Sequence, residues 1–266
     1  METLLSQILG TITLRPYFAA FFLAYFFACS LHLGLKRALL FAAAGYVIAW
    51  SSEYSSIHNG IPYGHYYYTW QTKGRELWTL GIPFMDSMSF VFLSYASYSM
   101  ALLALCPAAP GGVYLLENGR IRHSFKVCFL GALFCMYLDV LIDPLALKGD
   151  KWFLGQIYAY AGKGVYFGVP ISNFVGWFVV GFLLIYALQL IDRLLAASKA
   201  KDLPGIAYAW RHLPGPALYV SIIIFNLSVA LLIREDSLLW SDILILLLPS
   251  VLFVSLMRTR RYGVAP

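Results

Sequence analysis

Seven stretches of predominantly apolar residues dominate this sequence, and each is close to the roughly 20 residues that cross a lipid bilayer. The stretches cover residues 14–33, 38–54, 80–105, 127–145, 173–191, 217–233 and 238–257. Hydrophobic residues make up 61% of the chain and charged residues only 12%, which is outside the usual composition of soluble domains. The pattern predicts an all-α, polytopic membrane helical bundle of about seven transmembrane helices, with residues 1–266 as a single integral membrane domain.

The distribution of basic residues predicts how these helices are oriented. Of the 19 Lys and Arg residues, 12 fall in alternate connections that include the C-terminal end, and 7 fall in the opposite set. Because basic residues stay preferentially on the cytoplasmic side, we expect a multi-pass protein of the cell inner membrane with its C-terminus inside and its N-terminus outside. The first apolar stretch is longer than the apolar core of a signal peptide, so we expect it to remain as a helix.

The net charge of +6 does not indicate a nucleic-acid partner, because the basic residues occur singly or in short groups between apolar stretches. The four cysteines, at positions 29, 106, 128 and 135, show no CxxC spacing. We therefore expect the cysteines to be packing residues. We expect the lipid bilayer, rather than a nucleic acid, to be the partner that surrounds the chain.

Five polar side chains are expected to collect near the outer leaflet, because the predicted orientation puts each of them at the outer end of its helix. They are Glu53, Asp86, Asp139, Asp143 and Asn173. The two long outer connections, residues 58–79 and 148–172, are rich in Tyr, Trp and Gly and are expected to fold back over this region. Such backbone is tolerated at membrane depth only where protein covers it.

Asp139 and Asp143 are the strongest candidates for chemistry, because a spacing of four residues puts both carboxyl groups on one helix face. Two carboxylates this close in a site with little water do not both ionise easily, so one is expected to keep its proton. Such an acid can protonate an alkene while its partner takes a proton from water. Pro144 is expected to end or kink the helix at this point.

Structural roles compete with this interpretation. Asp143 would equally well cap or end its helix at the interface, and Asp139 would then pair with a basic residue such as Lys148 or Lys151. For Asp139 the functional interpretation is favoured, because an ionisable group inside a span is costly and usually has a function.

Glu53 and Asp86 are the next candidates, since both are expected to face the same pocket. Asp86 also suits the first turn of a helix, where a negative charge interacts well with the helix dipole. His58 and His65 are expected mainly to make interfacial hydrogen bonds, with substrate contact as the alternative. The chain lacks the HxxxH and HxxHH groupings of membrane di-iron hydroxylases, so the sequence predicts no metal site.

Aromatic residues make up 17% of the chain and cluster at residues 66–70 and 158–160. Most of them are expected to form the aromatic belts at the membrane interfaces. A few are expected to line an apolar slot, where the face of a ring would stabilise a transient carbocation.

Ordered segments between residues 53 and 177 carry a recognisable pattern. They are residues 59–66 (NGIPYGHY), 81–83 (GIP), 138–144 (LDVLIDP), 151–152 (KW) and 166–177 (YFGVPISNFVGW). Together they resemble the membrane carotenoid-biosynthesis family that includes carotenoid 1,2-hydratases and bisanhydrobacterioruberin hydratase. The remaining spans are similar to this family only in hydropathy.

The resemblance implies a cofactor-independent carotenoid hydratase, a hydro-lyase that adds water to the terminal C1–C2 double bond of an acyclic carotenoid end group. The product would be a tertiary alcohol, and the implied partners are the lipophilic carotenoid itself and other enzymes of the carotenoid pathway. From burial and spacing, the expected catalytic residues are Asp139, Asp143 and Glu53. The expected substrate contacts are Asp86, Asn173, His58, His65, Tyr63, Tyr166 and Trp177.

Other functions remain open at this point. A carotenoid end-group cyclase would share the protonation step and differ only in how the cation is quenched. A membrane transporter should show polar residues at successive depths in several spans, whereas here they gather at one leaflet. A retinal-binding receptor would need a Schiff-base lysine in the last helix, and residues 238–257 contain no lysine.

Overall fold

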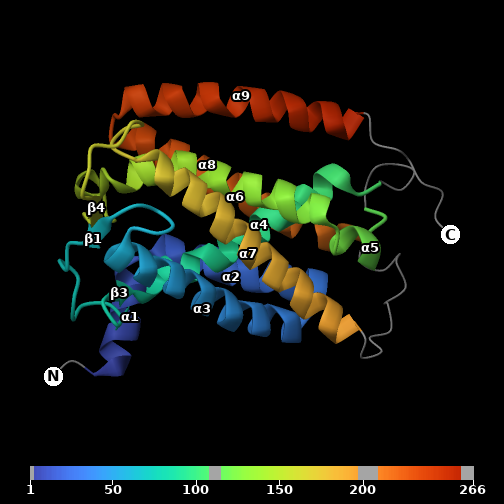
Figure 1. Ribbon diagram of the computed structural model, residues 1–266, viewed down its shortest axis with the longest axis horizontal. Coiled ribbons are helices and arrows are strands. Elements are labelled where there is room, and N and C mark those ends of the chain that lie inside the picture. Colours follow the sequence, from blue (N-terminus) through green and yellow to red (C-terminus); the bar gives the residue numbers. More distant parts are fainter. Residues whose placement is uncertain (1–2, 108–114, 197–208, 259–266) are drawn as a thin grey trace.

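Seven helices of 18 to 26 residues run along the length of the described molecule, shown in Figure 1. The computed structural model describes residues 3–107, 115–196 and 209–258. The long helices are α2 (Pro16–Leu33), α3 (Leu35–Asn59), α4 (Phe84–Leu105), α6 (Phe125–Ala146), α7 (Ile171–Ala196), α8 (Pro214–Leu232) and α9 (Asp236–Arg258). All except α3 are apolar enough to cross a membrane. The predicted all-α, multi-pass membrane architecture is therefore confirmed.

Each predicted span coincides with one of these helices, and the ends differ by a few residues. The largest extensions are at the ends of α3 and α7, which continue to Asn59 and Ala196, beyond the predicted ends at residues 54 and 191. Pro144 was expected to end or kink its helix, and the first alternative is wrong, since α6 continues to Ala146. Four of the basic residues used to predict the orientation, at positions 199, 201, 260 and 261, lie outside the described residues.

Short elements complete the described fold, and the apolar pattern did not predict them. They are α1 (Leu4–Leu14), α5 (Gly119–Arg122), η1 (Gly149–Lys151), η2 (Ala209–His212), β1 (Tyr66–Tyr68), β2 (Trp78–Thr79), β3 (Ile82–Pro83) and β4 (Tyr158–Tyr160). Figure 1 shows β1, β3 and β4 at one end of the helices and α5 at the opposite end.

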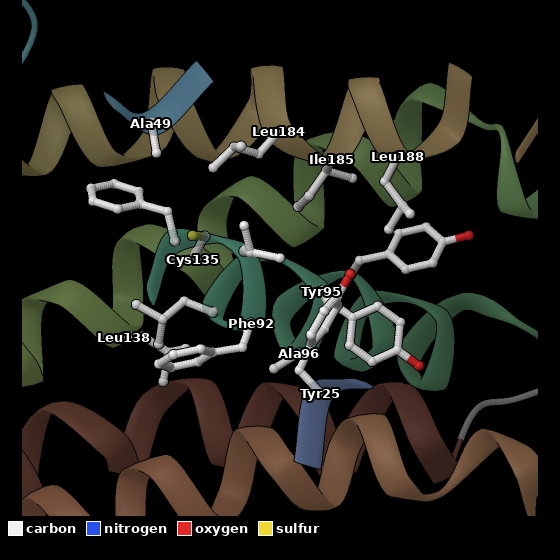
Figure 2. Packing of buried hydrophobic residues seen from close by; sticks show 14 of the residues in the cluster. Tyr25, Ala49, Phe92, Tyr95, Ala96, Cys135, Leu138, Leu184, Ile185 and Leu188 are labelled. Atoms are coloured by element: carbon white, nitrogen blue, oxygen red, sulfur yellow. The ribbon is translucent and has the colours of Figure 1, made fainter. Parts of the chain in front are cut away.

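Helix α4 is the centre of the bundle. It packs against α2, α3, α6, α7 and α8, and 83% of its most apolar stretch is buried. In Figure 2, Phe92, Tyr95 and Ala96 lie between the leucine and isoleucine side chains of α7 and Tyr25 of α2. A helix that is buried on all sides in this way fixes the positions of the helices around it.

Helices α6 and α7 approach each other closely because each has a glycine at the contact. A Cβ atom at Gly131 would lie 2.7 Å from Cδ1 of Ile185, and one at Gly181 would lie 3.0 Å from Cβ of Cys135. Small residues allow such close helix contacts in membranes, where packing rather than the hydrophobic effect drives association. The four cysteines are all buried, as expected for packing residues.

The two long connections on the strand side of the bundle pair with each other. Strand β1 from the first connection runs antiparallel to β4 from the second, with Tyr66 opposite Tyr160 and Tyr68 opposite Tyr158. Strands β2 and β3 form a second short pair within the first connection. The expectation that these connections fold back over the helix ends is confirmed.

Arg15 links both connections to the beginning of α2. Its guanidinium lies 3.1 Å from a carboxylate oxygen of Glu76, and both side chains are buried. The same guanidinium donates a hydrogen bond to the carbonyl oxygen of Leu154 in the second connection. Because a buried charge needs a partner, this contact holds three distant segments together.

Replacing Gly176 by alanine should loosen the first connection from α7. A Cβ atom there would lie 2.6 Å from Cδ1 of Tyr63 and 2.9 Å from the backbone of Pro62, so we expect a destabilisation of about 1–3 kcal/mol. Thermal unfolding of the detergent-purified protein measures this. Gly162→Ala is the control, because a Cβ atom at Gly162 meets nothing within 4 Å. Equal melting temperatures for the two variants would contradict the packing described here.

Candidate active site

A pocket lies among the helix ends near β1 and β4, and both strands contribute lining residues. Side chains from α2, α3, α4, α6, α7, α8 and both connections line it. The polar lining residues include Glu53, Asp86, Asp139, Asp143 and Asn173. Most of the others are aromatic or aliphatic, so a single pocket presents carboxyl groups within a mainly apolar surface.

The first polar group surrounds Asp143 near the end of α6. Tyr160 donates a hydrogen bond of 2.6 Å to Oδ2 of Asp143, and Tyr158 donates to Oδ1. The amide of Asn173, in the first turn of α7, donates to Oδ2 of Asp143 at 2.9 Å and to Oδ2 of Asp139 at 2.6 Å. Asn173 therefore bridges the two aspartates that share one face of α6.

The second polar group joins Glu53 of α3 to Asp86 of α4. The hydroxyl of Tyr68 lies 3.1 Å from Oε1 of Glu53 and 2.8 Å from Oδ2 of Asp86, so its one proton is available to either carboxylate. Ser87 donates to the other oxygen of Glu53. Asp86 is in the first turn of α4, as expected for a residue that interacts with the helix dipole, and it also lines the pocket.

Strand alternation explains why the connections supply so many hydroxyl groups. Successive side chains of a strand point to opposite faces, so Tyr66 and Tyr68 are buried while Tyr67 between them is exposed. Burial, reinforced by the nearby carboxylates, raises the pKa of Tyr158 and Tyr160. Their hydroxyl groups therefore keep their protons at neutral pH and remain donors.

The interfacial-belt interpretation is wrong for these tyrosines. Tyr66, Tyr158 and Tyr160 line the pocket, and Tyr68 connects its carboxylates. A Tyr-X-Tyr alternation is present in both connections at 66–68 and 158–160. That pattern is the signal that would have indicated two short strands with tyrosines on one face.

Aromatic rings form much of the apolar lining. Phe90 and Trp177 stack with ring centroids 4.1 Å apart and planes inclined by 10°, and Tyr63 packs against both rings. Tyr17 of α2 and Phe225 of α8 stack at 5.3 Å farther along the pocket. Such faces suit an extended unsaturated hydrocarbon, and they attract positive charge.

Three of the predicted substrate contacts do not line this pocket. His58 is exposed and its Nδ1 lies 2.8 Å from the carbonyl oxygen of Tyr54, in the last turn of α3. His65 is exposed because it precedes β1 in the alternation that turns Tyr66 inward. Tyr166 is half-buried and packs against Phe167 and Phe174 instead.

The competing structural interpretation of Asp139 required a basic partner. The structure gives Asp139 the amide of Asn173 as its hydrogen-bond donor, and Lys151 pairs instead with Glu235 at the exposed end of α8 and α9. Among the described residues that line the pocket there is no histidine or cysteine. The pocket thus offers carboxyl, amide and hydroxyl oxygen and nitrogen atoms for proton chemistry.

The fold and the pocket together define a polytopic helical membrane protein with a partly acidic, otherwise apolar binding pocket. The chain belongs to the carotenoid biosynthesis protein family, whose family model matches residues 5–251. The expected family is therefore confirmed, and with it a role in carotenoid biosynthesis. Neither a curated protein nor a solved structure matches the chain significantly.

Tyr68→Phe should destabilise the pocket, because it removes the hydroxyl that donates to Glu53 and Asp86. Leaving buried acceptors without a donor costs about 1–3 kcal/mol. Tyr67→Phe is a matched control on the neighbouring residue, whose side chain is 55% exposed. Thermal unfolding in detergent should show a lower melting temperature for Tyr68→Phe only. An equal fall in the melting temperature of Tyr67→Phe would contradict the proposed hydrogen-bonding role of Tyr68.

Proposed function

We propose that this chain hydrates the terminal C1–C2 double bond of an acyclic carotenoid end group and gives a tertiary alcohol. The observation that carries the proposal is the placement of four carboxyl groups in one pocket whose other lining side chains are mainly apolar and aromatic. Family membership supports a carotenoid as the substrate. Hydration of an alkene needs an acid, a base and a water molecule, and it needs no change of oxidation state.

Asp139 is proposed as the acid and Asp143 as the base. Asp143 accepts hydrogen bonds from Tyr158, Tyr160 and Asn173, which solvate its negative charge. Among the described hydrogen bonds, Asp139 accepts only from Asn173. A carboxyl group with so little compensation for a charge is the one that keeps its proton, so Asp139 has a proton to transfer.

In the proposed reaction, Asp139 transfers its proton to the less substituted alkene carbon, C2, and the π electrons form the new C–H bond. The positive charge left at tertiary C1 is captured by the oxygen of a water molecule. Asp143, or Glu53 as the alternative base, takes the proton that this water loses. Return of that proton to Asp139 restores the starting state, so the overall change is the addition of one water molecule.

The aromatic lining is proposed to stabilise the intermediate. The stacked pair of Phe90 and Trp177 lines the pocket beside the carboxyl groups, and a ring face attracts a nearby cation by about 0.5–2 kcal/mol. The remaining apolar surface, including Phe21 and Phe225, would hold the conjugated chain. Asn226 from α8 lines the same pocket and donates a hydrogen bond to the carbonyl oxygen of Ile222.

The predicted orientation remains part of the proposal. We place the chain in the cell inner membrane, with the carboxyl groups near the outer leaflet and the C-terminus in the cytoplasm. This orientation rests on the distribution of basic residues.

Asp139→Asn and Asp143→Asn should each lower formation of the hydroxylated carotenoid by at least about 100-fold, because each removes one step of proton transfer. The measurement is mass analysis of pigments from a lycopene-accumulating bacterium that expresses each variant. Asp150→Asn, at an exposed position in η1, is the matched control and should retain activity. Undiminished product from both pocket variants would refute the assignment of these residues.

The same experiment separates hydration from cyclisation. A hydrated product has the mass of the substrate plus one water, whereas an end-group cyclase leaves the mass unchanged. A wild-type product of unchanged mass would replace the hydratase proposal by the cyclase, and the roles of Asp139 and Asp143 in protonation would then be tested on that product.

A further inference from the structure

A second cluster of ionisable side chains lies at the end of the bundle opposite the pocket. His32 is near the end of α2, Glu117 precedes α5, and His212 ends η2. Nε2 of His32 lies 2.8 Å from Oε2 of Glu117, and Nδ1 of His212 lies 2.9 Å from the same oxygen. All three side chains are at least 93% buried.

We propose that His32, Glu117 and His212 bind a divalent transition-metal ion, with Zn²⁺ as the best-suited species. Their candidate ligand atoms all lie within 4.8 Å of one another. Two imidazoles and one carboxylate are a common zinc ligand set, in which tetrahedral bonds of about 2.0–2.2 Å put ligand atoms roughly 3.3–3.6 Å apart. The ligand atoms would therefore separate slightly from their present contacts when the ion binds. The sequence predicts no metal site, because these residues are far apart in the chain and match no local motif.

The buried ring of His212 turns its Nδ1 toward Glu117, since Nδ1 lies 2.9 Å from Oε2. That one oxygen therefore faces a ring nitrogen of each histidine. A metal ion bound between Nδ1, Oε2 and the imidazole of His32 would replace these direct contacts.

Groups around the cluster hold the proposed ligands in suitable orientations. The hydroxyl of Tyr95 lies 3.3 Å from Nδ1 of His32, so the opposite ring nitrogen is the one presented to Glu117. Nε of Arg122 lies 3.3 Å from Oε1 of Glu117, which leaves Oε2 for the metal. Contacts of this kind to the distal atoms of ligands are typical of metal sites.

Acidic side chains offset most of the positive charge near the cluster. Asp192 lies 2.6 Å from Nε of Arg37, 3.2 Å from Nε of Arg122 and 2.7 Å from Nε2 of His123. Asp192 and Glu117 therefore offset two of the arginines, and Arg211 beside His212 adds one positive charge. A divalent ion would link α2, the segment before α5 and the segment before α8 into one unit.

The alternative is a purely hydrogen-bonded group in which the two histidines share protons with Glu117. The approach of Arg211 Nε to Nε2 of His212, at 3.4 Å, favours a proton on Nδ1 and hence this alternative. Metal binding requires that Nδ1 be free of its proton, so the two arrangements exclude each other. They differ in the number of metal ions bound per chain, which can be measured.

The test uses the full chain in detergent, equilibrated with Zn²⁺, freed of unbound ion by gel filtration and analysed by mass spectrometry of the metal. Wild type should retain about one Zn²⁺ per chain. Glu117→Gln and His212→Ala should each lower the affinity at least about tenfold. His58→Ala, an exposed histidine at the other end of the bundle, is the matched control and should retain the metal.

Two further measurements on the wild type make the result independent of how well the variants fold. Co²⁺ bound in place of Zn²⁺ should give visible absorption bands, and added Zn²⁺ should raise the melting temperature of metal-stripped protein. Wild-type protein that retains no Zn²⁺ above the amount in Glu117→Gln would overturn the proposal. Loss of metal from His58→Ala to the same extent would also overturn it. None of these readouts depends on carotenoid hydration.

Discussion

The need to hydrogen-bond buried carboxyl groups inside an apolar bundle is the constraint on which the candidate site depends. Glu53 and Asp143 are both buried, and a carboxylate without donors would be very costly there. The helices supply part of the compensation through Ser87 and Asn173. The remaining donors are tyrosines of the two connections, so the site exists only when those connections fold over the helix ends.

Pairing between β1 and β4 therefore contributes directly to the candidate site. An irregular connection at membrane depth must have its backbone groups paired or covered, and the strand pair satisfies part of that need while turning Tyr66 and Tyr160 inward. Arg15 adds a second restraint through Glu76 and the carbonyl of Leu154. Neither connection would hold its tyrosines in place alone, because each uses the other as its partner.

Much of this arrangement could be predicted from the sequence, and the limits have physical causes. Hydropathy located the long helices, and the basic residues indicated that Glu53, Asp139 and Asn173 share one end. The tyrosine donors were missed because the Tyr-X-Tyr alternation in each connection spans only three residues, which makes it a weak periodic signal. His32 and His212 were missed because their proximity depends on helix packing, which local spacing does not encode.

The grouping of carboxyl groups in the pocket also limits how a substrate reacts. Asn173 bridges Asp139 and Asp143 through hydrogen bonds, while Phe21 and Phe225 belong to the apolar part of the lining. On the proposed function, an end group must reach Asp139 while the conjugated chain lies along the aromatic surface. Only one end of a symmetric carotenoid can occupy that position at a time. Hydration of both ends would therefore require release and rebinding in the reversed orientation, with the singly hydrated carotenoid as a free intermediate.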